Sequence, residues 1–107
     1  MPKYLFMANY SAESAKAIMS NGGTARRTAI EKMVSELGGR LESFHFAFGD
    51  NDAYVLVELP DNKTATAVAL TVNGSGAVTT RTVALLTPEE VDEASKIRPA
   101  YRPPGAS

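Results

Sequence analysis

The sequence lacks residues on which several common chemistries depend. Its 107 residues include no cysteine and a single histidine, His45. Without cysteine the chain cannot form a disulfide, a thiolate nucleophile or a cysteine-ligated metal site. One histidine leaves too few nitrogen ligands for a zinc site within one chain, so we expect no metal.

Long apolar segments are also missing. No apolar run approaches the roughly 20 residues that are needed to span a bilayer. The N-terminal segment MPKYLFMANYS has too short an apolar run for a signal peptide. We therefore expect a cytoplasmic protein that has no membrane partner.

The chain has no excess of charge of either sign. Its 11 basic and 12 acidic residues give a net charge of -1, and Arg26 and Arg27 form the only adjacent basic pair. This composition does not provide the basic patch of a nucleic-acid-binding protein. The length predicts one domain, residues 1–97, followed by a proline-rich tail at 98–107. A domain of this size has a modest core, and self-association would bury more surface.

The pattern of apolar residues and helix caps predicts an α+β fold. Helices are expected to begin after Ser11, Thr24 and Thr87, and another is expected at 61–73. The order βαββαβ predicts a ferredoxin-like domain, in which a four-stranded antiparallel sheet has helices on one face. The strands are expected at 3–10, 40–48, 53–60 and 77–86.

The hairpin formed by 40–60 places the histidine on one face of this sheet. A four-residue turn at 49–52 would put His45 opposite Leu56, with Tyr54 and Glu58 as its diagonal neighbours. The other side of the hairpin is wholly apolar and should pack against the helices. Its residues are Phe44, Phe46, Phe48, Val55, Val57 and Leu59.

The first strand is apolar on both sides, which indicates that both faces of the sheet are covered. Helices cover one face. A second copy of the chain is expected to cover the other in an isologous dimer, which would enclose a barrel-like cavity. The sequence does not distinguish a dimer from a larger homo-oligomer.

The predicted cavity suits a small apolar or aromatic ligand and needs no cofactor. In it His45 would act as a general acid or base, oriented by Glu58 or Tyr54. The simpler alternative is a histidine that is merely buried at the subunit interface. Asn9 and Tyr10 would line the mouth of the cavity. Its walls are expected to be Tyr4, Phe6, His45, Tyr54, Glu58 and Arg81.

Two loops have weaker signals. Asp50 and Asp52 in GDND begin like a calcium loop, but the rest of that pattern is missing and a plain hairpin turn is the simpler interpretation. The segment SNGG before Arg26 and Arg27 has the form of a generic anion site at a helix N-terminus. No strand leads into it, so a break between two helices is the simpler interpretation.

The chain as a whole resembles the GYD-domain family. The resemblance rests on YLFMANYSAESAK, on EKMVSELGGRLESFHFAFGDNDAYVLVELPD and on GSGAVTTRTVALLTPEEVDEA with the YRPPG end. At the turn that gives the family its name, Gly49 and Asp52 fit the Gly-Tyr-Asp signature, while an asparagine replaces the aromatic residue. The family is similar to the wider dimeric α/β-barrel group, which includes cofactor-free monooxygenases, isomerases and stress-response proteins.

Two functions of different classes follow. In the first, the protein is a homo-oligomer that binds a small molecule, and it is an enzyme without a bound cofactor if His45 and Glu58 are catalytic. In the second, it is a non-catalytic assembly or accessory module. A pocket with converging polar groups would favour the first function, and a filled interface would favour the second.

Overall fold

The segments rich in aromatic and β-branched residues form strands, and the alanine-containing segments between them form helices. The structure, a computed structural model, describes residues 1–105. Within this range every helix is too short or too polar to cross a membrane. The elements are β1 (Lys3–Tyr10), α1 (Ala12–Asn21), α2 (Gly23–Glu36), β2 (Arg40–Phe46), β3 (Ala53–Glu58), α3 (Asn62–Gly74), β4 (Val78–Leu85) and α4 (Pro88–Ala94).

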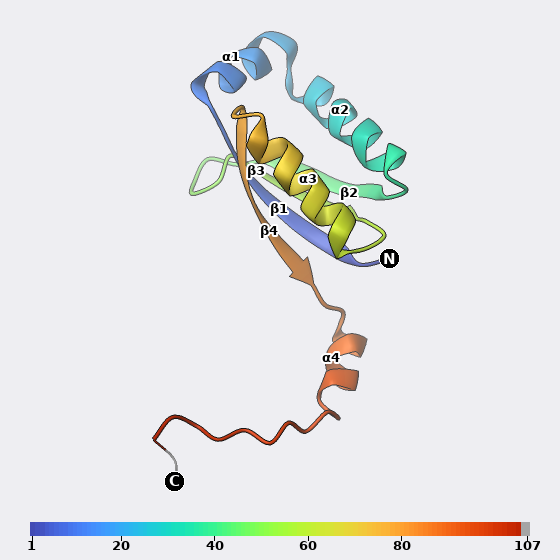
Figure 1. Cartoon of the computed structure of the whole chain (residues 1–107). Coiled ribbons are helices and arrows are strands. Elements are labelled where there is room, and N and C mark those ends of the chain that lie inside the picture. Colours follow the sequence, from blue (N-terminus) through green and yellow to red (C-terminus); the bar gives the residue numbers. More distant parts are fainter. Residues whose placement is uncertain (106–107) are drawn as a thin grey trace.

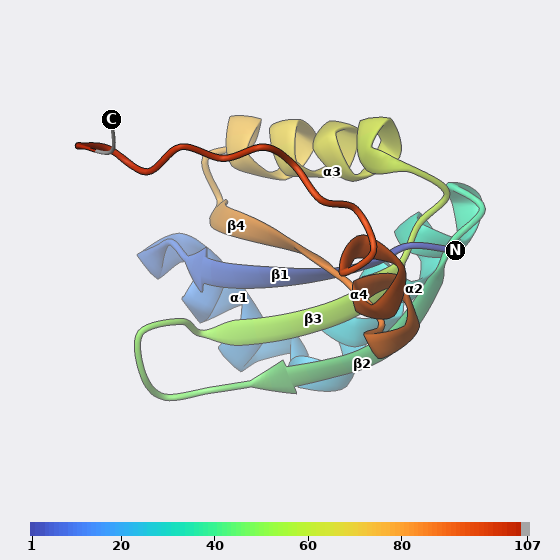
Figure 2. The ribbon, with the colours of Figure 1, turned by 90° about the horizontal axis from the view of Figure 1, so that it is seen from below.

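The four strands form one antiparallel sheet in the order β2-β3-β1-β4 (Figure 2). Helices α1, α2 and α3 lie on one face of the sheet and leave the other face open (Figure 1). This is the ferredoxin-like arrangement that the βαββαβ order predicts, so the predicted fold class is confirmed. The second copy expected on the open face stays a prediction.

Side-chain caps start three of the four helices. Ser11, Asp61 and Thr87 each accept a hydrogen bond from a backbone N–H in the first helical turn. Helix α2 differs, because its N-cap is Gly22 at a φ of 88° and no side chain caps it. The prediction that Thr24 caps this helix is therefore wrong: a glycine that tolerates positive φ lets the chain turn and begin the helix earlier.

The core lies between the helices and one face of the sheet. Along β1, Tyr4, Phe6 and Ala8 are buried while the residues between them are only partly covered, which is the alternation of a strand. Helix α2 packs on β2 and α3 packs on β4, so these two helices cover opposite edges of the same face of the sheet. The buried apolar side chains are Tyr4, Phe6, Ala8, Val34, Ala53, Val55, Val57, Leu59, Ala65, Val68 and Val78.

The β2–β3 hairpin has a longer turn than predicted. His45 lies opposite Tyr54, and Phe46 lies opposite Ala53. The predicted pairing of His45 with Leu56 is therefore wrong by two residues. Because the shift is an even number, the paired side chains keep the faces that were predicted for them.

The turn is held by β1 as well as by its own hairpin. The N–H of Asp52 donates to the carbonyl of Ala8 (2.8 Å), and the carboxylate of Asp52 accepts from the N–H of Tyr10 (2.9 Å). These bonds tie Asp52 to β1, so β2 ends at residue 46 and residues 47–52 form the turn. Phe48, which was expected in the core, lies in this turn and is fully exposed.

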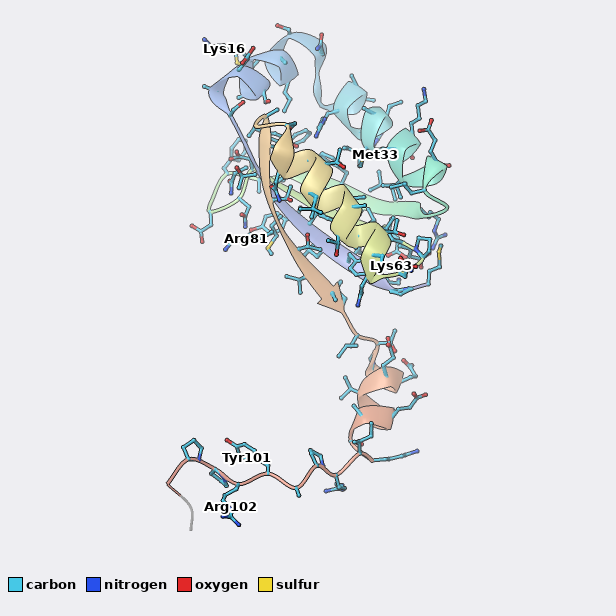
Figure 3. The ribbon with its side chains drawn as sticks, viewed as in Figure 1. Lys16, Met33, Lys63, Arg81, Tyr101 and Arg102 are labelled. Carbon is cyan, nitrogen blue, oxygen red and sulfur yellow. The ribbon has the colours of Figure 1, made fainter. Side chains whose placement is uncertain are left out.

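The C-terminal segment projects away from the sheet. It continues from the end of β4 and carries Tyr101 far from the other elements (Figures 1 and 3), and the longest dimension of the chain is 60 Å. The side chains of Val91, Ile97 and Tyr101 are each more than half exposed. The tail predicted at 98–107 has no helix or strand in its described part, and its last two residues lie outside the described residues. Residues 88–105 are named the C-terminal arm below.

Candidate functional site

A polar network on the open face is built around Asn51. This side chain, in the β2–β3 turn, is only 3% exposed. Its carbonyl oxygen accepts hydrogen bonds from Asn9 (3.2 Å) and Arg81 (3.1 Å). Its amide donates to the hydroxyl of Tyr54 (3.2 Å). Three predicted binding residues from three strands are thus brought together, and Arg81 lies on the side of β4 away from α3 (Figure 3).

Sequence reasoning missed Asn51 itself. An asparagine in a turn commonly bonds its own backbone, and nothing in the local pattern indicates contacts with β1 and β4. The residue stands in the turn where the family signature has an aromatic residue. Its amide group therefore supplies a polar centre at this position of the open face.

His45 and Glu58 lie apart within one chain. His45 is exposed and lies opposite Tyr54, which precedes Glu58 by four residues on β3, or about 13 Å at the usual rise of a strand. Glu58 lies instead beside Lys3 and Arg40, with N–O distances of 3.9 Å and 3.3 Å. The structure does not bring the predicted catalytic pair together, and the catalytic role of both residues stays a prediction.

The ion pairs at this end of the sheet form a balanced cluster. Glu42, at an irregularity in the β2–β3 pairing, lies 2.8 Å from Lys3 and 3.4 Å from Arg40. The hydrogen bond from Lys3 lowers the pKa of Glu42 below its ordinary value. With Glu58, the cluster has two cations and two carboxylates, so this end of the open face carries no net charge.

The other predicted pocket residues face the helices. Tyr4 and Phe6 belong to the buried core, where the Tyr4 hydroxyl donates to the side-chain oxygen of Asn62 (2.6 Å). Phe6 and Tyr10 line a cleft on the helix side. The sheet thus divides the single pocket that was expected, because alternate residues of a strand point to opposite faces.

The helix-side cleft has two compartments that meet at Tyr10, Arg26 and Val78. The inner compartment, between the sheet and helices α2 and α3, has a volume of about 40 Å³. The outer one, between α1, α2 and the start of β4, has a volume of about 260 Å³. Met33 lies on the side of α2 that faces α3 (Figure 3). The walls of the inner compartment include Phe6, Ile30, Met33, Val34, Leu59 and Val68.

Arg26 lies where the two compartments meet. Its guanidinium carbon is 5.8 Å from the centre of the Tyr10 ring, within the range of a cation–π contact. Its Nε atom is buried and has no hydrogen-bond partner among the described residues. The sequence contained a signal for this position, because Arg26 is spaced four and seven residues from Ile30 and Met33, on the apolar face of α2.

The surroundings of Tyr10 change the pKa of its hydroxyl. Burial raises the pKa of Tyr10 above its ordinary value of 10.0, although the hydrogen bond and the charge of Arg26 counteract part of the rise. The unfolded chain therefore loses this proton first as the pH increases. We expect a contribution to stability that is fully present below about pH 10 and is lost as the pH rises through the raised pKa.

Urea unfolding across the alkaline range checks this expectation. Tyr10→Phe should lose less stability than wild type between about pH 9 and pH 11. Tyr101→Phe is the control, because Tyr101 is exposed in the C-terminal arm. Equal alkaline losses in wild type and Tyr10→Phe would contradict the expectation.

The acidic turn has a structural role. Asp52 accepts the backbone hydrogen bond from Tyr10 described above, whereas Asp50 is exposed. Within residues 1–105, no three histidine, aspartate or glutamate side chains gather in a way that could hold a metal ion. The hydrogen bonds of Asp52 with β1 are a sufficient reason for its carboxylate at this position, and they involve no bound ion.

The antiparallel sheet, its three covering helices and its open second face define a small α+β domain of the ferredoxin-like class. The sequence model of the GYD domain family matches residues 4–95, which is most of the chain. The chain therefore belongs to the GYD domain family, as its resemblance indicated. No curated protein and no solved structure matches the chain.

Proposed function

We propose that this GYD-domain protein binds a small apolar molecule in the helix-side cleft. The observation that carries the proposal is the form of the cleft, in which an apolar inner compartment opens into an outer one of about 260 Å³. Ligand sites have mostly apolar walls and a few polar groups that orient the ligand, and volumes from about 300 Å³ upward. Tyr10 and Arg26 provide such groups at the junction.

The proposal moves the ligand away from the face on which it was first expected. Of the residues predicted to bind, Phe6 and Tyr10 line the helix-side cleft. Asn9, Tyr54 and Arg81 lie on the open face in the Asn51 network. A catalytic role of His45 and Glu58 would require residues from a second copy, since the two are separated within one chain.

An NMR titration with two neutral probes, 1-hexanol and toluene, tests the proposal. Both should shift the amide signals of residues around the cleft in wild type. Val72→Phe should abolish these shifts, because Val72 is a half-buried wall residue of the inner compartment and a larger ring would fill it.

Leu70→Phe on the same helix is the matched control, because Leu70 is 70% exposed and does not line the cleft. It should leave the shifts unchanged. Absence of any shift in wild type, or shifts confined to the open face, would overturn the proposal.

A homo-oligomeric assembly module is the second candidate, and the open face favours it. The neighbouring side chains Leu5, Leu56 and Val83 form an apolar row across the three strands β3, β1 and β4. The charged cluster beside this row is balanced, so two copies related by a two-fold axis would not repel each other there. The C-terminal arm adds exposed apolar side chains that could pack on the same second copy. The two candidates are compatible, and we place the assembly in the cytoplasm.

A further inference from the structure

The two compartments of the helix-side cleft differ in polarity. The inner compartment is walled almost entirely by apolar side chains. The outer compartment adds the polar side chains of Ser14 and Asn21. Arg26 is the only cation that lines either compartment, and no acidic side chain of the described residues lines them. A molecule with an apolar end and one negative charge would match the apolar inner compartment and the single cation beside it.

One N–H group of the Arg26 guanidinium has no acceptor among the described residues. A buried N–H donor without an acceptor destabilises the folded chain, and the Nε of Arg26 is such a donor. The ring of Tyr10 holds the guanidinium at the junction from one side. The nearby carboxylate of Asp52 already accepts the N–H of Tyr10 and is not part of the cleft walls.

We propose that the cleft takes a small apolar carboxylic acid in its ionised form, with the carboxylate paired to Arg26 at the junction and the hydrocarbon directed into the inner compartment. This inference rests on the proposed function, because it names the ligand class of the same site. A planar carboxylate can accept hydrogen bonds from two adjacent N–H groups of a guanidinium, including Nε.

The charge of the site selects a monoanion. One guanidinium balances one carboxylate, whereas a phosphate monoester carries a charge of about -1.5 to -2 near pH 7 and would leave part of it unpaired. Unpaired charge next to apolar walls is unfavourable. Met33 in the wall is unbranched and flexible, which lets the inner compartment adapt to the end of a hydrocarbon chain.

The test compares hexanoate, 1-hexanol and hexyl phosphate by NMR titration of the full chain at neutral pH. Hexanoate should bind about tenfold more tightly than 1-hexanol, in line with a charge-assisted hydrogen bond. It should also bind more tightly than hexyl phosphate. The largest shifts should come from amides near Tyr10 and Arg26.

Variants of α2 assign the effect to one side chain. Arg26→Gln keeps a polar group but removes the charge, so this variant should bind hexanoate no more tightly than it binds 1-hexanol. Arg26→Lys keeps the charge but loses the planar fork, and should retain part of the preference even if Arg26→Gln folds poorly. Arg27→Gln is the matched control. Arg27 is next to Arg26 in the sequence, but its side chain is exposed and lines neither compartment.

The outcomes separate the two levels of the proposal. Equal binding of hexanoate and 1-hexanol, or full hexanoate affinity in Arg26→Gln, would overturn the carboxylate and leave the small-molecule site in place. Tighter binding of hexyl phosphate than of hexanoate would overturn the carboxylate and indicate a phosphate-bearing ligand instead. If none of the three probes and no toluene binds, the proposed function itself is overturned.

Discussion

Replacing Leu5 with glutamate is expected to convert the proposed dimer into a monomer. Leu5 lies in the central strand β1, directly between Leu56 of β3 and Val83 of β4 on the open face. A carboxylate at this point would be enclosed between two apolar side chains that offer it no hydrogen bond. A charge buried without a partner at an interface costs about 2 to 5 kcal/mol, which would weaken the association at least thirtyfold.

Light scattering at several protein concentrations measures this change. Leu70→Glu is the matched control, since it introduces the same charge at a residue that is 70% exposed on α3, on the helix side of the sheet. It should leave the mass unchanged. The assembly proposal fails if wild type is a monomer at every concentration, or if both variants dissociate to the same extent.

Local sequence was sufficient to predict the elements of this fold. Ser11, Asp61 and Thr87 begin their helices because each offers a side-chain oxygen to backbone N–H groups that lack a partner within the helix. Such signals extend over three or four residues and depend little on the rest of the chain. The order of these elements then leaves few arrangements, and the ferredoxin-like sheet is one of them.

The register of the hairpin could not be predicted in the same way. A turn of four residues satisfies the local pattern, but the actual turn depends on contacts between Asp52 and β1, more than 40 residues earlier in the chain. These contacts compete with pairing inside the hairpin. They leave Phe48 exposed although its own residue type favours the core.

The candidate sites could not be predicted from local sequence either. Alternation along β1 indicates that Tyr4 and Phe6 share a face, but the division between the cleft and the open face depends on where each helix packs. In the sequence Arg26 stood out as half of a basic pair that follows the SNGG segment. Its position on the apolar face of α2 becomes significant once Tyr10 and the cleft lie beside it.

Gly39 connects the stability of the fold to the walls of the cleft, and Gly39→Ala is expected to destabilise the protein severely. A methyl group here would overlap the carbonyl oxygen of Glu58, lie 2.9 Å from Leu59 and lie 3.2 Å from Val34. The backbone of Gly39 is also fixed by a hydrogen bond to the Val34 carbonyl (3.0 Å). Overpacking against fixed backbone leads us to expect a loss of about 3 kcal/mol in the free energy of unfolding.

Gly74→Ala is the control for this substitution. Gly74 lies at the end of α3, nothing lies within 4 Å of an added methyl group, and its φ is not positive. Alanine should therefore leave the stability unchanged or raise it by up to about 1 kcal/mol. Urea unfolding distinguishes the two, and similar free energies of unfolding for both variants would contradict the close packing at Gly39. Because Val34 and Leu59 also wall the inner compartment, any folded Gly39→Ala protein should bind 1-hexanol less tightly than Gly74→Ala does.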